Sequence, residues 1–254
     1  MFEPVQDPDP GDDRFLEDHG LYAEELFVNY ETGHFAGYAG KFNPSFGTAW
    51  DLAPGIFGTD LAEDYEITER IGLGGALKFG GDGFGGEGFG EHRLALNGYF
   101  ADTTFLSESA ITRRGELDLD DGGPSNTEDL SSLSATLDGG GMQGVPVNYH
   151  LGVQVQDGGT GTPETQVGYV VGLNGSFALT PQVTLEPIVE NAYITNFGGV
   201  EEDRNYATAG ASVLYGPWNV ALSYTNRHVD PAGAESYTDD HVQLSGGYAF
   251  ENGL

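Results

Sequence analysis

A few basic side chains in this sequence stand at positions from which they could act on charged solutes. Lys41, Arg70, Lys78 and Arg93 come from three segments in which apolar residues alternate with small or polar ones. Successive side chains of a strand point to opposite faces, so these four cations are expected to share one side of three consecutive strands. Their field would orient dipolar molecules and select solutes by charge. The alternative is that they only pair with carboxylates of nearby loops.

The opposite charge gathers in two long segments predicted as loops, 48–66 and 104–131. The first also carries apolar residues that should pack against something, and folding into the mouth of a surrounding sheet would bury them. Either segment could narrow such an opening, and the alternative for both is a solvated loop. The candidate residues are Asp51, Asp60, Glu63 and Asp64 in the first segment, and Arg113, Arg114, Asp118, Asp120 and Asp121 in the second.

Period-two alternation recurs along the whole chain, and no segment has a convincing helical pattern. It predicts eleven strands, each about ten residues long. They are expected at 22–31, 34–42, 67–79, 92–103, 132–138, 147–156, 165–178, 183–193, 205–215, 218–227 and 241–250.

The connections between these segments alternate between tighter ones, such as Thr32-Gly33 and Gly216-Pro217, and longer, acidic ones rich in Gly and Pro. An up-and-down antiparallel sheet gives this pattern, because successive connections fall at opposite ends. Aromatic residues flank the end with the short turns: Tyr30, Phe35, Phe79, Phe177, Tyr215, Trp218, Tyr248 and Phe250. Such rings suit the interface of a bilayer. We therefore expect the apolar face to meet lipid and the polar face to line a wet interior. A soluble β-sandwich with its apolar face inward would alternate in the same way.

The amino-acid composition limits which classes of partner the protein can bind. The chain has 254 residues, with 9 Lys and Arg against 40 Asp and Glu and a formal net charge of −31. That charge repels nucleic acid and anionic surfaces, and favours cations. There is no cysteine, hence no disulfide or thiolate chemistry. No apolar run is long enough for a membrane helix, and the first residues do not resemble a signal peptide.

No cofactor or resident metal is expected. The acidic stretches "DPDPGDD" (7–13) and "DLDDGG" (118–123) could collect Ca²⁺ weakly, although neither has the spacing of an EF-hand. Ser, His and Asp occur without a nucleophile elbow, so the sequence does not predict an enzyme.

The segment "ELFVNYETGHFAGYAGKFNPSFG" (25–47) resembles the outer-membrane porins of Gram-negative bacteria. The stretches "DLAEDYEITERIGLGGAL" (60–77) and "YFADTTFLS" (99–107) are similar to the same proteins, and the likeness extends over essentially the whole chain. The resemblance implies a closed antiparallel transmembrane β-barrel in the bacterial outer membrane, often trimeric, that passes small hydrophilic solutes. The order of loops in that family slightly favours 104–131 as the constriction.

Both ends of the sequence depart from the porin pattern. The chain stops at "YAFENGL" without a terminal aromatic residue, and eleven is an odd number of strands for a bacterial barrel. We therefore expect residues 1–254 to be a single porin-like domain lacking strands at both ends. About eleven strands of a larger, 16-stranded barrel would then form a gapped barrel.

The expected function is a water-filled channel for passive diffusion, with a mild preference for cations because of the net negative charge. Its partners would be outer-membrane lipid and small ions and solutes. Two alternatives stay open: a soluble, acidic, Ca²⁺-binding β-sandwich, and an outer-membrane barrel that acts as an enzyme or an adhesin.

Overall fold

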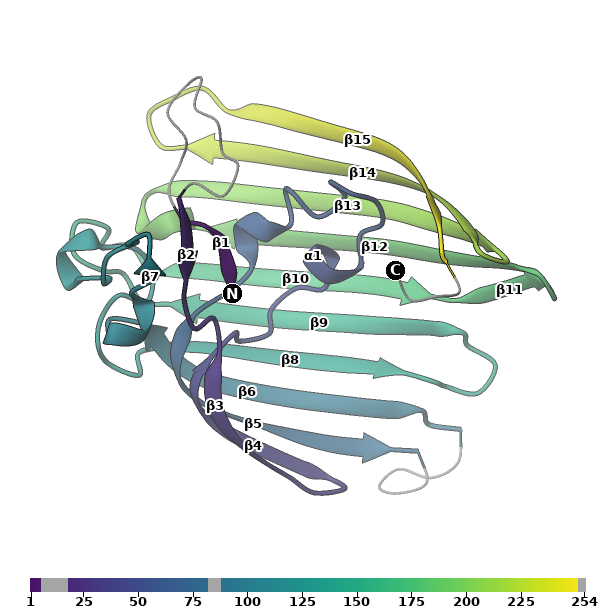
Figure 1. The fold of residues 1–254 in the computed structure, drawn as a ribbon, viewed down its shortest axis with the longest axis horizontal. Coiled ribbons are helices and arrows are strands. Elements are labelled where there is room, and N and C mark those ends of the chain that lie inside the picture. Colours follow the sequence, from purple (N-terminus) through teal and green to yellow (C-terminus); the bar gives the residue numbers. More distant parts are fainter. Residues whose placement is uncertain (6–17, 82–87, 251–254) are drawn as a thin grey trace.

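The structure is a computed structural model that describes residues 1–5, 18–81 and 88–250. In these residues the chain is all-β, with one large antiparallel sheet and a second sheet of three short strands. Eleven strands of the large sheet lie side by side, and a twelfth pairs only with one of them (Figure 1). The eleven are β3 (Leu26–Glu31), β4 (Phe35–Phe42), β5 (Arg70–Gly80), β6 (Glu91–Ala101), β8 (Ser132–Gly140), β9 (Val147–Gln156), β10 (Gln166–Gly175), β12 (Val183–Thr195), β13 (Glu202–Tyr215), β14 (Trp218–Pro231) and β15 (Tyr237–Tyr248).

The order of these strands across the sheet is their order along the chain, and every pairing is antiparallel. The prediction of eleven antiparallel strands in an up-and-down arrangement is therefore confirmed. The sheet does not close into a barrel. It is open, with β3 at one edge and β15 at the other.

The predicted strand 165–178 is wrong in one respect, because it is two strands. β10 ends at Gly175, and β11 (Phe177–Thr180) then pairs with β12. The break lies opposite Pro187 of β12, between the pairs Asn174–Ile188 and Phe177–Leu185. Proline has no N–H to give to a ladder, so the pairing is interrupted at that level.

The connections divide between the two ends of the sheet as the sequence predicted. Tight turns at 32–34 and 216–217 lie at the right-hand end in Figure 1, and the long segments 43–69 and 102–131 start from the other end. The three-stranded sheet lies at this long-connection end and consists of β1 (Phe2–Pro4), β2 (His19–Leu21) and β7 (Ala110–Ile111). These strands are two or three residues long, too short to give a period-two pattern.

The two faces of the large sheet differ in chemistry. The outer face carries large apolar side chains that remain exposed: Val171 is 49 %, Leu222 is 55 % and Leu244 is 74 % exposed. The inner face carries small and polar side chains, many of them buried, such as Thr136 and Ser223. The apolar face is thus not packed against a second sheet, which a β-sandwich requires.

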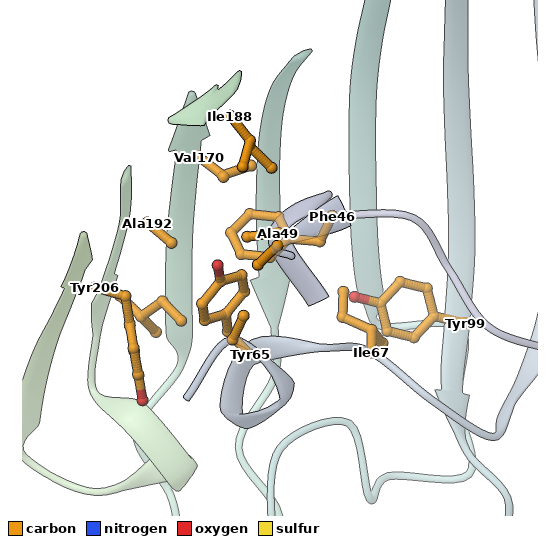
Figure 2. Close-up of a cluster of buried hydrophobic side chains, with 12 residues drawn as sticks. Phe46, Ala49, Tyr65, Ile67, Tyr99, Val170, Ile188, Ala192 and Tyr206 are labelled. Atoms are coloured by element: carbon orange, nitrogen blue, oxygen red, sulfur yellow. The ribbon is translucent and has the colours of Figure 1, made fainter. Parts of the chain in front are cut away.

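The core lies on the inner face, beneath residues 43–69, which we call the inner segment. It includes α1 (Ala49–Leu52) and η1 (Glu63–Tyr65). Figure 2 shows its side chains against those of the sheet. The buried cluster consists of Phe46, Ala49, Ala53, Ala62, Tyr65 and Ile67 from the segment, and Tyr99, Val170, Ile188, Ala192, Ile194 and Tyr206 from the strands.

The short helix α1 corrects the expectation of a chain without helices. Four residues give no periodic signal, and the Thr48 side chain does not cap the helix. Its stability comes from a strand side chain described below, which the local sequence cannot supply. No helix within the described residues is long and apolar enough to cross a membrane.

Candidate functional site

The candidate site is the inner face of the sheet together with the inner segment that crosses it. At β8, the hydroxyls of Ser45 and Thr136 are 3.2 Å apart. At the opposite edge, Gln243 of β15 donates to the Pro54 carbonyl oxygen over 3.3 Å, and its side-chain oxygen accepts the N–H of Phe57. The segment therefore spans the face from the middle strands to the β15 edge.

Glu190 of β12 is the centre of this attachment. It is 4 % exposed, and its carboxylate accepts four hydrogen bonds from neutral groups of the inner segment. The Thr48 N–H and hydroxyl donate over 2.8 and 2.7 Å, the Ala49 N–H over 3.1 Å and the Tyr65 hydroxyl over 2.8 Å. Two of these donors are backbone N–H groups at the start of α1, which have no partner within the helix. Burial and the nearby carboxylate raise the pKa of Tyr65, so its hydroxyl keeps the donated proton.

Asp64 fastens the other end of the inner segment. Its carboxylate accepts hydrogen bonds from Arg227 of β14 over 2.6 Å and from the Tyr206 hydroxyl of β13 over 2.9 Å, and it is 3.6 Å from Arg204. Arg227 also binds Asp239 of β15 over 2.7 Å. One predicted loop carboxylate thus meets two arginines of the sheet that were not among the sequence-based candidates.

Small residues on the strands make room for the segment. A Cβ at Gly168 would lie 2.8 Å from the ring of Phe46, and a Cβ at Gly210 would lie 2.6 Å from the ring of Pro54. Both distances are shorter than carbon atoms tolerate, so the close approach of the segment requires glycine at these positions.

Lys41 is fully buried at the end of β4, in an ionic cluster rather than at an open surface. Its ammonium lies 2.6 Å from Glu69 and 2.8 Å from Asp102, and it donates to the Leu106 carbonyl oxygen over 2.9 Å. Glu69 also accepts two hydrogen bonds from Arg114. Burial would by itself raise the pKa of Glu69, but the hydrogen bonds from Arg114 and Lys41 outweigh it and hold that pKa below its usual range.

The other three predicted basic residues lie on β5 and β6. Lys78 and Arg93 stand directly opposite one another, with side chains 43 % and 37 % exposed. Lys78 pairs with Glu31 of β3, whereas Arg93 lies 3.9 Å from a carboxylate oxygen of Asp138. Arg70 donates to the Thr68 carbonyl oxygen over 2.8 Å.

The remaining loop candidates fall into two groups. Asp51, Asp60 and Glu63 are exposed on the inner segment. Arg113, which pairs with Glu108, and the η3 residues (Leu119–Asp121) with their cap Asp118 stay at the long-connection end. Of the two candidate segments, the one that lies across the inner face is therefore 48–66, and not 104–131.

Sequence reasoning missed Glu190, Arg204 and Arg227. A signal exists for the first: by strand alternation Glu190 falls on the inner side between Ile188 and Ala192, where an isolated carboxylate needs a partner. The two arginines stand near strand ends among other charged residues, where nothing in the sequence distinguishes them.

The site offers polar and charged groups. Among the described residues, no group of three or more His, Cys, Asp or Glu side chains could hold a metal ion. The acidic stretch 7–13, a weak Ca²⁺ candidate, lies outside the described residues.

Comparison with known proteins gives no match: no family model, no curated protein and no solved structure is similar to this chain.

We expect Glu190→Gln to loosen the inner segment. An amide keeps one acceptor but turns an N–H₂ group toward N–H and hydroxyl donors, which should cost about 2–3 kcal/mol. The check is denaturant unfolding together with hydrogen exchange of residues 48–52. Glu186→Gln is the matched control, because Glu186 is exposed on the same strand. Equal effects of the two changes would contradict the role of Glu190.

A pH effect is expected from Glu66. Burial, with the nearby carboxylates of Glu63, Glu24 and Asp51, raises the pKa of Glu66 to about 7. A carboxyl group with a raised pKa in the folded state destabilises the fold as it ionises, so its penalty appears as the pH rises through that pKa. Glu66→Gln should therefore gain stability relative to wild type at pH 8 and not at pH 5, in thermal melts at both values. Asp60→Asn, an exposed change in the same segment, should show no such difference.

Proposed function

We propose that this protein forms the wall of a β-barrel channel in a bacterial outer membrane, through which small hydrophilic solutes and ions diffuse. The observation that carries the proposal is the exposed apolar belt on the outer face of the sheet, set against a polar inner face. The belt consists of Leu73, Leu77, Leu94, Leu96, Leu133, Leu151, Val155, Tyr169, Val171, Leu173, Val189, Tyr193, Val213, Tyr215, Trp218, Val220, Leu222, Tyr224, Val242, Leu244 and Tyr248.

The dimensions of the belt suit a bilayer. On β12 the outer positions from Val183 to Tyr193 carry no charge. They extend over about 33 Å of strand, or about 25 Å across a membrane at the usual tilt of barrel strands. The first outer-facing charges come at the long-connection ends, at Asp203, Asp230 and Asp240. Lipid on this face would therefore meet no charge within the hydrocarbon layer.

Tyrosine and tryptophan mark both margins of the belt. At the short-turn end, the rings of Trp218 and Tyr248 are 4.7 Å apart and both are exposed. At the other margin, the Tyr193 hydroxyl donates to Asp203 over 2.8 Å and the Tyr224 hydroxyl to Asp240 over 2.6 Å. Rings with an apolar body and a polar tip favour the two interfaces of a bilayer.

An exposed apolar belt of this extent would be unusual on a soluble protein. Apolar patches on soluble monomers rarely exceed a few hundred Å², and this one extends over nine consecutive strands. The sandwich alternative would bury the same residues between two sheets.

In a membrane channel, the two open edges of the sheet, β3 and β15, would have to be paired with further strands. β3 and β15 both run from the long-connection end to the short-turn end, because eleven strands alternate in direction. Hydrocarbon does not tolerate unpaired strand edges. An all-antiparallel barrel therefore closes only when an odd number of further strands, of this or another chain, lies between these edges.

Within such a channel, the inner segment would narrow the passage and set its charge. Asp51, Asp60 and Glu63 are exposed on the segment, and Lys78 and Arg93 are part-exposed on the facing side of the sheet. Opposite charges across a water-filled gap orient dipolar solutes. The net charge of −31 favours cations in the mouth.

The function is tested by adding the full chain to a planar bilayer. We expect stepwise ionic conductance and, in a KCl gradient, a reversal potential of the sign for mild cation preference. Anion selectivity would contradict the charge argument. Membranes that hold the inserted protein but conduct nothing would contradict the channel itself.

The orientation of the sheet is tested by two neighbouring substitutions on β15. Leu244→Lys puts a charge on the outer face and should lower the inserted fraction in liposome flotation, at a cost of about 2–4 kcal/mol near the midplane. Ser245→Lys puts the same charge on the inner face and should insert like wild type. If Ser245→Lys impairs insertion as much as Leu244→Lys, the assignment of the faces is wrong.

A further inference from the structure

His150 of β9 lies beneath the start of the inner segment with both ring nitrogens in contact with oxygen. Nδ1 is 2.6 Å from Oδ1 of Asp138, and Nε2 is 2.9 Å from the carbonyl oxygen of Phe46. The residue is 2 % exposed. In the sheet register, Asp138 stands directly beside it on β8, and Gly172 on the other side separates it from Glu190.

The two contacts require a particular number of protons. A carbonyl oxygen only accepts, so Nε2 must donate to Phe46. The contact with Asp138 then needs a second hydrogen, carried either by Nδ1 or by the carboxyl group. An imidazolium beside a carboxylate and a neutral imidazole beside a carboxylic acid carry the same number of protons. The pair therefore needs two protons for its two contacts, whichever of the two groups holds the second one. Without one of these protons, two lone pairs face each other in one contact.

We propose that His150 and Asp138 form a pH-sensitive latch, which holds the first residues of the inner segment on the sheet through the Phe46 carbonyl group and releases them when the pair loses one proton.

The charged groups around His150 determine what happens when the pair loses a proton. Within the part of the chain that the structure describes, the charged groups around His150 are Asp138 on β8 and Glu190 on β12, with Arg93 of β6 beyond Asp138. Arg93 lies 3.9 Å from Asp138 and directly opposite it in register. When the pair has lost one proton, the Asp138 carboxylate holds the remaining hydrogen on Nδ1, so Nε2 turns a lone pair toward the Phe46 carbonyl oxygen and Phe46 loses its bond. Because the protonated pair holds the segment, the attachment is complete at low pH and is lost as the pH rises through the titration of the pair.

The release is local. Glu190 and Asp64 still hold the residues around Thr48, Tyr65 and η1 by contacts that do not include His150. The change is therefore confined to the stretch from Phe46 toward α1. The latch concerns the attachment of the inner segment and does not require that the protein conducts ions.

Trp50 is a built-in reporter of this attachment. The chain has two tryptophans, and Trp50 packs against the buried cluster that includes Phe46, whereas Trp218 is 58 % exposed on the outer face. In the full-length protein with Trp218→Phe and Glu66→Gln, studied in detergent, fluorescence then reports on the inner segment without the titration of Glu66. From about pH 5 to about pH 9, across the range in which His titrates, we expect one single-proton transition to red-shifted, more easily quenched emission.

Two variants and a control identify the group responsible. In the background with Trp218→Phe and Glu66→Gln, His150→Gln should abolish the transition. Asp138→Asn should also abolish it but keep the low-pH emission throughout, because the amide can donate to Nδ1 of a neutral imidazole. His241→Gln changes a histidine on β15, distant from Phe46 in the sheet, and should leave the transition in place.

Several results would overturn the latch. They are a Trp50 signal that does not change with pH, a transition that persists in His150→Gln, or one that disappears in His241→Gln. If His150→Gln does not fold, Asp138→Asn decides alone: high-pH emission of the released kind in that variant contradicts the proton count. None of these readings depends on the conductance measurements.

Discussion

The carboxylate of Glu190 has to be solvated by protein, because it lies on the inner face of β12 at 4 % exposure. A buried charge without partners is costly, and the sheet around it supplies mostly small and apolar neighbours. The inner segment provides the missing donors, two backbone N–H groups and two hydroxyls. The same contact also caps α1, a helix too short to form by itself. The Glu190 carboxylate and the donors of the inner segment therefore satisfy each other's hydrogen bonds. This contact fixes where the segment lies on the sheet, and so where the buried cluster forms.

This attachment makes the inner face a core of unusual composition. Its apolar part is small and centred on a few rings, among them Tyr65 and Tyr206 with centroids 5.0 Å apart. Its periphery is ionic, with Asp64 between two arginines at one side and the His150–Asp138 pair at the other. The segment is therefore held by hydrogen bonds and charges as much as by apolar burial. Interactions of that kind respond to protonation, which apolar contacts do not.

The outer face obeys a different constraint. Its large side chains do not contribute to the core, and many of them are about half exposed. A sheet that keeps its apolar residues outside needs an apolar environment to be stable there, and in the proposed channel lipid would provide it. The proposed channel thus accounts for both faces of the sheet: the apolar belt would contact lipid, and the polar inner face would line the water-filled passage.

The sequence by itself determined the strands and the character of their faces. Alternation is a local property, since every second side chain points to the same side whatever the sheet does next. The residues from Val147 to Gln156 therefore predicted the bounds of β9, and those from Trp218 onward predicted which side chains of β14 share a face. Whether the apolar face is exposed or buried was left open by alternation alone. The division between short and long connections followed in the same way, from turn residues such as Gly216 and Pro217.

Only the tertiary structure decided what the long segments do and which charges meet. Asp64 and Arg227 are 163 residues apart in the chain, and Thr48 and Glu190 are 142 apart. Of two acidic segments with similar composition, 48–66 reached the inner face because a buried carboxylate and glycines at 168 and 210 receive it there. Lys41, expected at an open wall, is instead enclosed by Glu69 and Asp102. Such pairings depend on the register and curvature of a whole sheet, and no periodicity within a single strand encodes them.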